Sequence, residues 1–198
     1  MALKNNIYRL KSILRHPIKF LKATGSTTTN ISDLTRWENI ENLHEEWDSR
    51  TIMIARLIPP NSRVLEFGAA RLVLRDHLPI NCSYQPSDIV DRGGKTIVCD
   101  LNKEFPILID HYTHVIFSGV LEYIFDIDKL LKELKTHSDV IITSYATTDE
   151  ISDYVTRRQS GWVNHFNNEE IIFIFSKNGY KLNSSYIWKL QTIYVFTR

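Results

Sequence analysis

Three acidic side chains, Glu66, Asp88 and Asp100, are expected at the ends of three consecutive strands. A turn of small residues, Gly68-Ala69-Ala70, follows the first strand and leads into a helix. Small residues let a ligand approach the backbone closely, and a helix start presents free N–H groups to an anion. Asp88 lies 20 residues beyond Gly68, the spacing of the acid that binds ribose hydroxyls in nucleotide-binding α/β folds. A lone acid could simply be solvated, but three together predict one ligand crevice.

Seven segments have the composition of β-strands, and helical segments alternate with the early ones. They cover residues 63–67, 82–88, 96–101, 114–118, 140–144, 181–188 and 192–197. Strands that alternate with helices predict right-handed crossovers and a mostly parallel sheet. Only a short turn, 189–191, separates the last two strands, so these are expected to pair antiparallel as an edge hairpin. The sequence therefore predicts an α/β fold whose ligand crevice lies at the carboxyl ends of the strands.

Helices are expected before the first strand, at residues 7–21, 37–47 and 49–58, the last stopped by a pair of prolines. Asp126 or Asp128 is suited to cap the helix that follows the fourth strand. Asn167 or Asn168 is suited to cap a later helix, and Gly179 to end it.

The composition indicates one soluble domain. The chain has 198 residues, 43% of them hydrophobic and 24% charged, which suffices for a core without disulfide staples. We expect no membrane span and no secretory signal, and therefore a cytoplasmic protein. Cys82 and Cys99 form no metal-spaced pair, and the histidines show no ligand spacing, so we expect no metal site. A net charge of +1 argues against a nucleic-acid partner.

The near-neutral charge divides into two unequal parts. Residues 1–30 hold six of the 24 Lys and Arg and no acid, so residues 31–198 carry 18 bases against 23 acids. We interpret 1–30 as a basic amphipathic arm with a polar linker, and 31–198 as the domain. The apolar face of the arm either packs on the domain or on a second subunit, giving a homo-oligomer, or makes weak contact with an anionic membrane surface.

Several segments together resemble the class I S-adenosylmethionine-dependent methyltransferases. The resemblance covers about residue 47 to the C-terminus, and its motifs are specific only in combination. They are residues 64–70 (VLEFGAA), 84–88 (YQPSD), 98–102 (VCDLN), 117–124 (FSGVLEYI) and 162–170 (WVNHFNNEE). The resemblance implies a Rossmann-like, mostly parallel sheet of about seven strands with an antiparallel C-terminal hairpin, flanked by helices and preceded by N-terminal helices. It also implies S-adenosyl-L-methionine as the cofactor.

The resemblance also implies roles for individual residues. Gly68 would let the backbone pass the methionine portion, while Glu66 would orient the turn or bind the amino group. Asp88 would take both ribose hydroxyls. Asp100 would accept from the adenine amino group, with Leu101 packed on the ring. The remaining expected cofactor contacts are Ala70 in the turn, and Ser118 and Gly119 on the floor near the methionine.

The turn departs from the family pattern at two positions. The glycine usual two residues after Gly68 is here Ala70, and the next glycine position is Leu72. An alanine is tolerated there if its φ stays negative, although the turn becomes tighter; otherwise cofactor binding would weaken, or fail as in a degenerate relative. Arg71 either pairs with the methionine carboxylate or is solvated.

Catalytic residues are less clearly indicated, because methyl transfer is an in-line displacement that mainly needs two positioned reactants, sometimes with a base. His165 lies where an acceptor-facing loop is expected and has a suitable ordinary pKa; alternatively, it only positions that loop. Tyr145 contacts the acceptor or the cofactor, or packs in the core. Glu122 is an acceptor ligand or, as we favour, a helix N-terminal acid. Trp47 with Arg50 could cover the crevice.

We therefore expect an enzyme that transfers a methyl group from S-adenosylmethionine to a small-molecule or glycan acceptor. A second hypothesis is a non-catalytic binding module of the same fold, motivated by Ala70 and the lack of a clear base. A third, a nucleotide-binding oxidoreductase, is disfavoured because the turn lacks the G-x-G-x-x-G glycines that approach a pyrophosphate.

Overall fold

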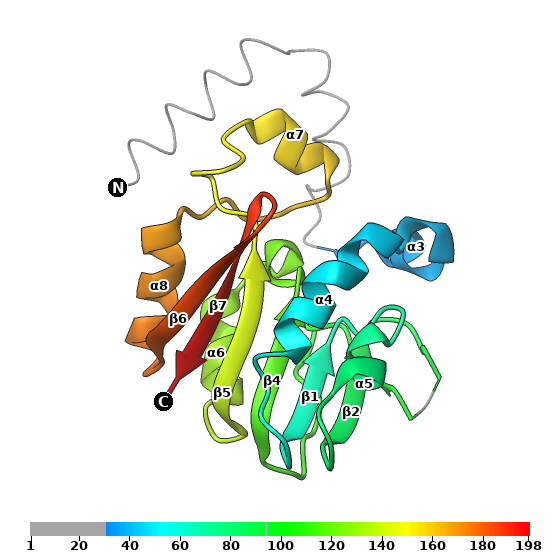
Figure 1. The fold of residues 1–198 in the computed structure, drawn as a ribbon. Coiled ribbons are helices and arrows are strands. Elements are labelled where there is room, and N and C mark those ends of the chain that lie inside the picture. Colours follow the sequence, from blue (N-terminus) through cyan, green and yellow to red (C-terminus); the bar gives the residue numbers. More distant parts are fainter. Residues whose placement is uncertain (1–30, 94) are drawn as a thin grey trace.

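A seven-stranded mixed sheet forms the centre of the computed structural model, which describes residues 31–93 and 95–198 (Figure 1). The strand order is β3-β2-β1-β4-β5-β7-β6. The first five strands pair parallel, and β7 runs antiparallel to both β5 and β6. The strands are β1 Arg63–Phe67, β2 Ser83–Asp88, β3 Ile97–Val98, β4 Tyr112–Ser118, β5 Ser138–Tyr145, β6 Lys181–Trp188 and β7 Gln191–Thr197. The predicted α/β fold with its antiparallel C-terminal hairpin is confirmed; the predicted arm, 1–30, lies outside the described residues.

Helices cover both faces of the sheet. In chain order they are α3 Leu34–Glu38, α4 Asp48–Ala55, α5 Val73–His77, α6 Ile127–Leu134, α7 Tyr154–Gln159 and α8 Asn168–Lys177, with 3₁₀ turns η1 Ile40–Asn42, η2 Glu45–Trp47 and η3 Leu121–Tyr123. None of the helices in the described ranges has the length and apolarity needed to cross a bilayer.

The side chains of the central strands alternate between the two faces of the sheet, and this divides the core into two layers. Successive strand side chains point to opposite faces, so Leu65 joins one buried cluster and its neighbour Val64 the other. The first cluster includes the apolar face of α6 and the buried residues of α8, and the second includes those of α4 and α5. Because both faces are covered, the inner strands are apolar on both sides.

Local capping signals define two helices as predicted. The Asp126 side chain accepts a hydrogen bond from the Lys129 backbone N–H and caps α6. Asn167 begins α8 in a reciprocal capping box with Glu170. The helix ends at Asn178, and Gly179 follows with φ of 89°, the left-handed conformation that glycine adopts without strain.

Two element predictions need correction. The helix expected over 37–47 is broken into the end of α3 and two 3₁₀ turns. Asn39 is extended and its side chain accepts from the Glu41 N–H, while the Asn42 side chain donates to the Arg36 carbonyl; both bonds compete with a continuous helix. The strand expected over 96–101 is only β3, because the carbonyl of Asp100 accepts from two later N–H groups and turns the chain.

The order of the strands determines where a ligand can bind. From β1 the chain adds β2 and β3 on one side, and then returns to place β4 on the other. In an open α/β sheet the crevice lies at such a switch point, outside the carboxyl ends of the strands. The turns after β1, β2 and β4 all lie at this edge.

Candidate active site

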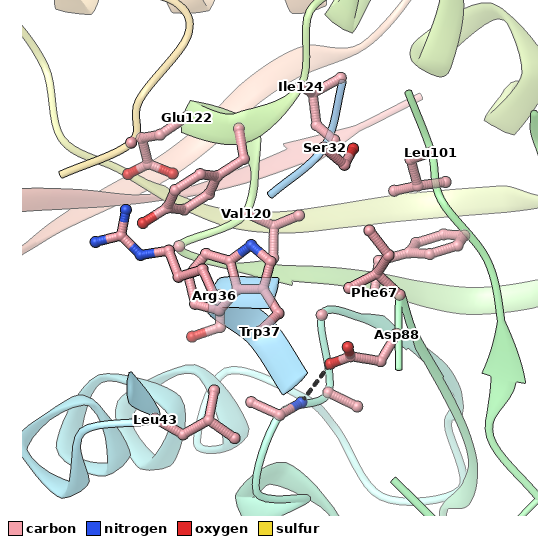
Figure 2. Close-up of a pocket in the computed structure, with 18 of the residues that line it drawn as sticks. Ser32, Arg36, Trp37, Leu43, Phe67, Asp88, Leu101, Val120, Glu122 and Ile124 are labelled. Atoms are coloured by element: carbon pink, nitrogen blue, oxygen red, sulfur yellow. Dashed lines mark hydrogen bonds between the residues drawn. The ribbon is translucent and has the colours of Figure 1, made fainter. Parts of the chain in front are cut away.

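A cavity of about 430 Å³ lies at the carboxyl edge of β1, β2 and β4. All eight residues predicted to contact a cofactor line it: Glu66, Gly68, Ala70, Asp88, Asp100, Leu101, Ser118 and Gly119. Figure 2 shows Phe67, Asp88 and Leu101 on one side of this cavity, and Arg36, Trp37 and Glu122 on the other. The sheet therefore brings the predicted cofactor residues together, whereas the N-terminal residues Arg36 and Trp37 were not predicted as part of the site.

The turn after β1 is built from left-handed residues. Gly68 has φ of 70°, and a Cβ there would collide with the Val120 side chain, so glycine is required by space as well as by conformation. Ala70 has φ of 44° and Leu72 φ of 60°. Ala70 therefore does not meet the condition of a negative φ under which its methyl would be tolerated, and adopts a left-handed conformation instead. Its N–H donates to Asp88 Oδ2 at 2.8 Å, which holds the turn in this shape (Figure 2).

The Asp88 carboxylate is already engaged by its surroundings. Oδ1 accepts from the Val90 N–H at 3.1 Å and lies 3.2 Å from Nη2 of Arg92, while Oδ2 accepts from Ala70. A carboxylate has about four acceptor positions, so one remains on Oδ2. Arg92 also donates to the Trp37 carbonyl at 2.8 Å and thus joins this acid to the helix α3. The contact with Trp37 spans 55 residues of sequence, so no local pattern predicts it.

Glu66 lies beneath the turn and is only 2% exposed. The Tyr84 hydroxyl donates to its Oε2 at 2.5 Å. Burial raises the pKa of Glu66 to about 8, although the hydrogen bond from Tyr84 acts in the opposite direction. The carboxyl is therefore largely protonated at neutral pH and can donate as well as accept.

Asp100 lies under the segment that precedes α3. Its Oδ1 accepts from the Ser32 hydroxyl at 2.6 Å and from the Asn102 N–H at 3.1 Å, and Lys103 Nζ lies 3.6 Å from Oδ2. Asn102 in turn donates to Ser32 and to the Tyr123 carbonyl. Residues far apart in the chain thus close one end of the cavity beside Leu101.

Arg50, on α4, is a buried cation in the cavity wall and 5% exposed. Its three hydrogen bonds go to neutral oxygens: the hydroxyl and carbonyl of Ser118 at 3.0 Å each, and the side chain of Gln191 at 2.9 Å. It forms no ion pair within the described part of the chain. Burial lowers its pKa. Arg71, by contrast, lies 3.4 Å from Glu45 and 3.6 Å from Asp48. Arg50 is therefore a buried cation of the cavity wall that an anionic ligand could pair with.

Glu122 is a second buried charge in the wall, 1% exposed and in the first turn of η3. Its Oε1 accepts from the Ala146 N–H at 2.9 Å, whereas its buried Oε2 has no hydrogen-bond partner among the described residues. Burial raises its pKa, and the Coulombic attraction of Arg50 and Arg157 opposes that shift. The role favoured from the sequence for Glu122, an acid at a helix N-terminus, agrees with its position in η3 but does not explain the unpartnered Oε2.

The two predicted catalytic residues, His165 and Tyr145, do not line this cavity. The Tyr145 hydroxyl donates to the Asn164 side chain at 2.5 Å and accepts from the Phe166 N–H at 3.1 Å. His165 accepts at Nδ1 from Arg157 Nε at 3.1 Å. Arg157 is itself fully buried and donates to the Ala146 carbonyl. These groups hold the loop between α7 and α8 against the end of β5.

Solved structures of methyltransferases share this arrangement of strands and helices. The chain superposes on the 1,6-didemethyltoxoflavin-N1-methyltransferase of Burkholderia thailandensis, bound to S-adenosylhomocysteine and 1,6-didemethyltoxoflavin, with a TM-score of 0.62 at 14% identity, over 83% of this chain and 84% of that one. This chain has the class I methyltransferase fold. The structure of mitomycin 7-O-methyltransferase superposes with a TM-score of 0.67 at 13% identity, over 92% of this chain and 68% of that one.

An O-methyltransferase from neocarzinostatin biosynthesis, in complex with S-adenosylmethionine and 2-hydroxy-5-methyl naphthoic acid, gives a TM-score of 0.64 at 12% identity, over 94% of this chain and 70% of that one. No protein-family model and no curated protein matches the sequence. The resemblance stated from the motifs is thus confirmed at the level of the fold.

Proposed function

We propose that the protein transfers a methyl group from S-adenosylmethionine to a small-molecule acceptor, with glycans included in that class. The observation that carries this proposal is the cavity at the switch point, lined by all eight predicted cofactor residues. The neighbours support it, because structures at this level of similarity hold S-adenosylmethionine or S-adenosylhomocysteine and, in two cases, a small aromatic substrate.

The adenosine portion fits the side of the cavity formed by β1, β2 and the segment after β3. We propose that the remaining acceptor position on Asp88 takes one ribose hydroxyl, and that a second requires Arg92 to move off Oδ1. Within the part of the chain that the structure describes, Oδ2 of Asp100 has one polar neighbour, Lys103 Nζ at 3.6 Å, and it is the acceptor left for the adenine amino group. Leu101 supplies apolar contact for the ring.

The methionine portion fits the side formed by the turn after β1 and the start of the segment after β4. We propose that Arg50 binds its carboxylate, because a buried guanidinium without an anionic partner is costly and this one lines the cavity. Gly68 and Gly119 keep the backbone accessible there, since a Cβ on Gly119 would come within 2.5 Å of Arg50. The sulfonium of the cofactor, when bound, supplies an activated methyl carbon, and the protein's task is to align an acceptor with it.

His165 and Tyr145 then have positioning roles in this proposal. Both lie in the network around Arg157 that holds the 162–166 loop, and neither lines the cavity. A non-catalytic binding module remains the second candidate. It is favoured by the alanine in the left-handed turn and by the engaged carboxylate of Asp88.

Isothermal titration calorimetry tests the proposal. The intact chain is expected to bind S-adenosylmethionine and S-adenosylhomocysteine, and NAD not at all. Asp88→Asn is expected to weaken S-adenosylhomocysteine binding about 10-fold or more, since it removes charge from an acceptor of hydroxyl hydrogen bonds. Asp91→Asn is the matched control, because Asp91 is exposed and does not line the cavity. Failure to bind either compound at millimolar concentration would contradict the proposal.

A further inference from the structure

Arg36 is a cation on the cavity wall with no ion pair or side-chain hydrogen bond in the described part of the chain. Its backbone is held on both sides: the N–H donates to the Asp33 side chain, and the carbonyl accepts from Asn42. The side chain is held by packing, with its guanidinium 5.6 Å from the centre of the Trp37 ring. A guanidinium fixed in this way keeps its N–H groups available for an anion.

The backbone at Gly161 leaves space for that guanidinium. Gly161 has φ of 81°, and a Cβ at this position would collide with Nη1 of Arg36 and come within 3.5 Å of Tyr123. The Trp37 and Tyr123 rings meet edge to face, with centroids 4.9 Å apart, and Trp162 donates from its indole N–H to the Tyr123 hydroxyl at 3.2 Å. Arg36 therefore lies beside Trp37, whose ring meets Tyr123, which in turn contacts Trp162, and all three rings line the cavity.

Glu122 adjoins this aromatic group. It precedes Tyr123 in η3, and its carbonyl accepts from the Val163 N–H at 2.8 Å. Its Oε2 is buried, and no residue in 31–93 or 95–198 gives it a hydrogen bond. Figure 2 shows it on the same side of the cavity as Arg36 and Trp37, away from Asp88 and Leu101. A buried carboxylate oxygen without a donor is a position at which a ligand can supply one.

We propose that this end of the cavity binds a planar, anionic acceptor that carries a hydroxyl or amino nucleophile. Arg36 pairs with the anionic group, the rings of Trp37, Tyr123 and Trp162 contact the planar body, and Oε2 of Glu122 accepts the nucleophile's hydrogen. The proposal rests on the proposed function, and it specifies the substrate class of the same cavity. An acceptor with both an anion and a ring would use the free cation and the aromatic wall together.

The assignment of Glu122 is chemically balanced. Its Oε2 takes the proton of the acceptor's hydroxyl or amino group. The lone pair of that oxygen or nitrogen forms the new bond to the methyl carbon, while the carbon–sulfur bond breaks and its electron pair stays on sulfur. A carboxylate whose pKa is raised by burial is a stronger base than an exposed one, which suits this proton transfer.

Binding of four probes, measured by calorimetry with the chain saturated by S-adenosylhomocysteine, tests the proposal. They are 3-hydroxy-2-naphthoate, 2-naphthoate without the hydroxyl, neutral 2-naphthol and non-aromatic cyclohexanecarboxylate. We expect 3-hydroxy-2-naphthoate to bind at least 10-fold more tightly than 2-naphthol or cyclohexanecarboxylate. Arg36→Gln should remove the preference for the anion, whereas the control Arg56→Gln, at an exposed position, should keep it.

Glu122→Gln is expected to abolish the advantage of 3-hydroxy-2-naphthoate over 2-naphthoate, because the amide offers a donor where the carboxylate offers an acceptor. The same variant should keep its affinity for S-adenosylhomocysteine within about 2-fold, since Oε1 and its bond from Ala146 are preserved. Weaker cofactor binding in this variant would place Glu122 at the methionine amino group and overturn its assignment. Equal affinity for the charged and neutral probes, or no binding of either naphthoate at millimolar concentration, would overturn the proposal. Failure of S-adenosylhomocysteine itself to bind would instead contradict the proposed function.

Discussion

The Asp88 carboxylate accepts a hydrogen bond from the backbone N–H of Ala70 at 2.8 Å, across 18 residues of sequence. This bond connects the ribose-binding acid of the proposed site with the residue that replaces a glycine of the family pattern. It holds Ala70 at φ of 44°, a conformation that costs a non-glycine residue about 1–2 kcal/mol. The alanine is accommodated because the acid stabilises the strained turn.

Ala70→Gly is therefore expected to stabilise the protein. Relief of the strained φ is worth about 1–2 kcal/mol, and the greater flexibility of glycine in the unfolded chain offsets about 0.4–1 kcal/mol of it. The measurement is the free energy of unfolding in urea. Ala69→Gly is the matched control, because Ala69 is not among the positive-φ residues, and it should lose about 0.5–1 kcal/mol. Equal destabilisation by both changes would show that the turn is not strained at Ala70.

Arg50→Gln is expected to weaken binding of the methionine half of the cofactor and to leave binding of the adenosine half unchanged. If the guanidinium binds the methionine carboxylate, affinity for S-adenosylhomocysteine should fall about 10- to 100-fold, the effect of one charged hydrogen-bonding partner. Affinity for 5′-methylthioadenosine, which has no carboxylate, should stay within about 2-fold. Calorimetry with both ligands makes the comparison. An equal loss for both would mean that Arg50 supports the cavity wall through Ser118 and Gln191 and does not bind the carboxylate.

Stability is expected to fall with rising pH because of Glu66. Its pKa is 4.5 when unperturbed and about 8 in the folded chain, where burial dominates over the opposing effects of Tyr84 and Arg50, and Asp88 adds to it. Between these values the folded state binds one more proton than the unfolded state, so this group's contribution to stability is complete below pH 4.5 and is lost towards pH 8. The slope from this group is at most about 1.4 kcal/mol per pH unit.

Urea unfolding at a series of pH values between 5 and 8 measures this slope. Glu66→Gln should flatten the dependence, because the amide has no proton to lose and can still accept from the Tyr84 hydroxyl. Burial also raises the pKa of Glu122, but this residue is present in both the unaltered chain and Glu66→Gln, so it does not affect the difference between their pH dependences. Parallel curves for the two proteins would show that Glu66 is ionised in the folded state.

Local sequence patterns predicted much of the fold, because they act over a few residues. The bounds of β1 and β6 agree with those expected, and the caps at Asp126 and Asn167 follow from side chains that bind backbone groups three residues away. Acids at the ends of neighbouring parallel strands had to meet at one edge of the sheet, so the cofactor side of the cavity was also predictable.

The acceptor side could not be predicted in this way. Arg36 and Trp37 reach the cavity because α3 is tied to distant groups, Trp37 by Arg92 and the preceding Ser32 by Asp100. Sequence separations of 55 and 68 residues leave no local signal. The left-handed conformation of Ala70 could not be predicted for the same reason, since the hydrogen bond that its N–H donates to Asp88 exists only in the folded sheet.

Tyr145→Phe tests whether the Tyr145 hydroxyl positions the loop or takes part in catalysis, because the two roles predict different effects on stability and ligand affinity. The hydroxyl donates to Asn164 and accepts from the Phe166 N–H, so its removal leaves buried polar groups without partners and should cost about 1–3 kcal/mol of stability. Affinity for S-adenosylhomocysteine should not change, because Tyr145 does not line the cavity. The control Tyr186→Phe, at an exposed position on β6, should have little effect on either measurement. Unchanged stability together with weaker binding of 3-hydroxy-2-naphthoate would place the hydroxyl at the acceptor instead, one of the alternatives that the sequence left open.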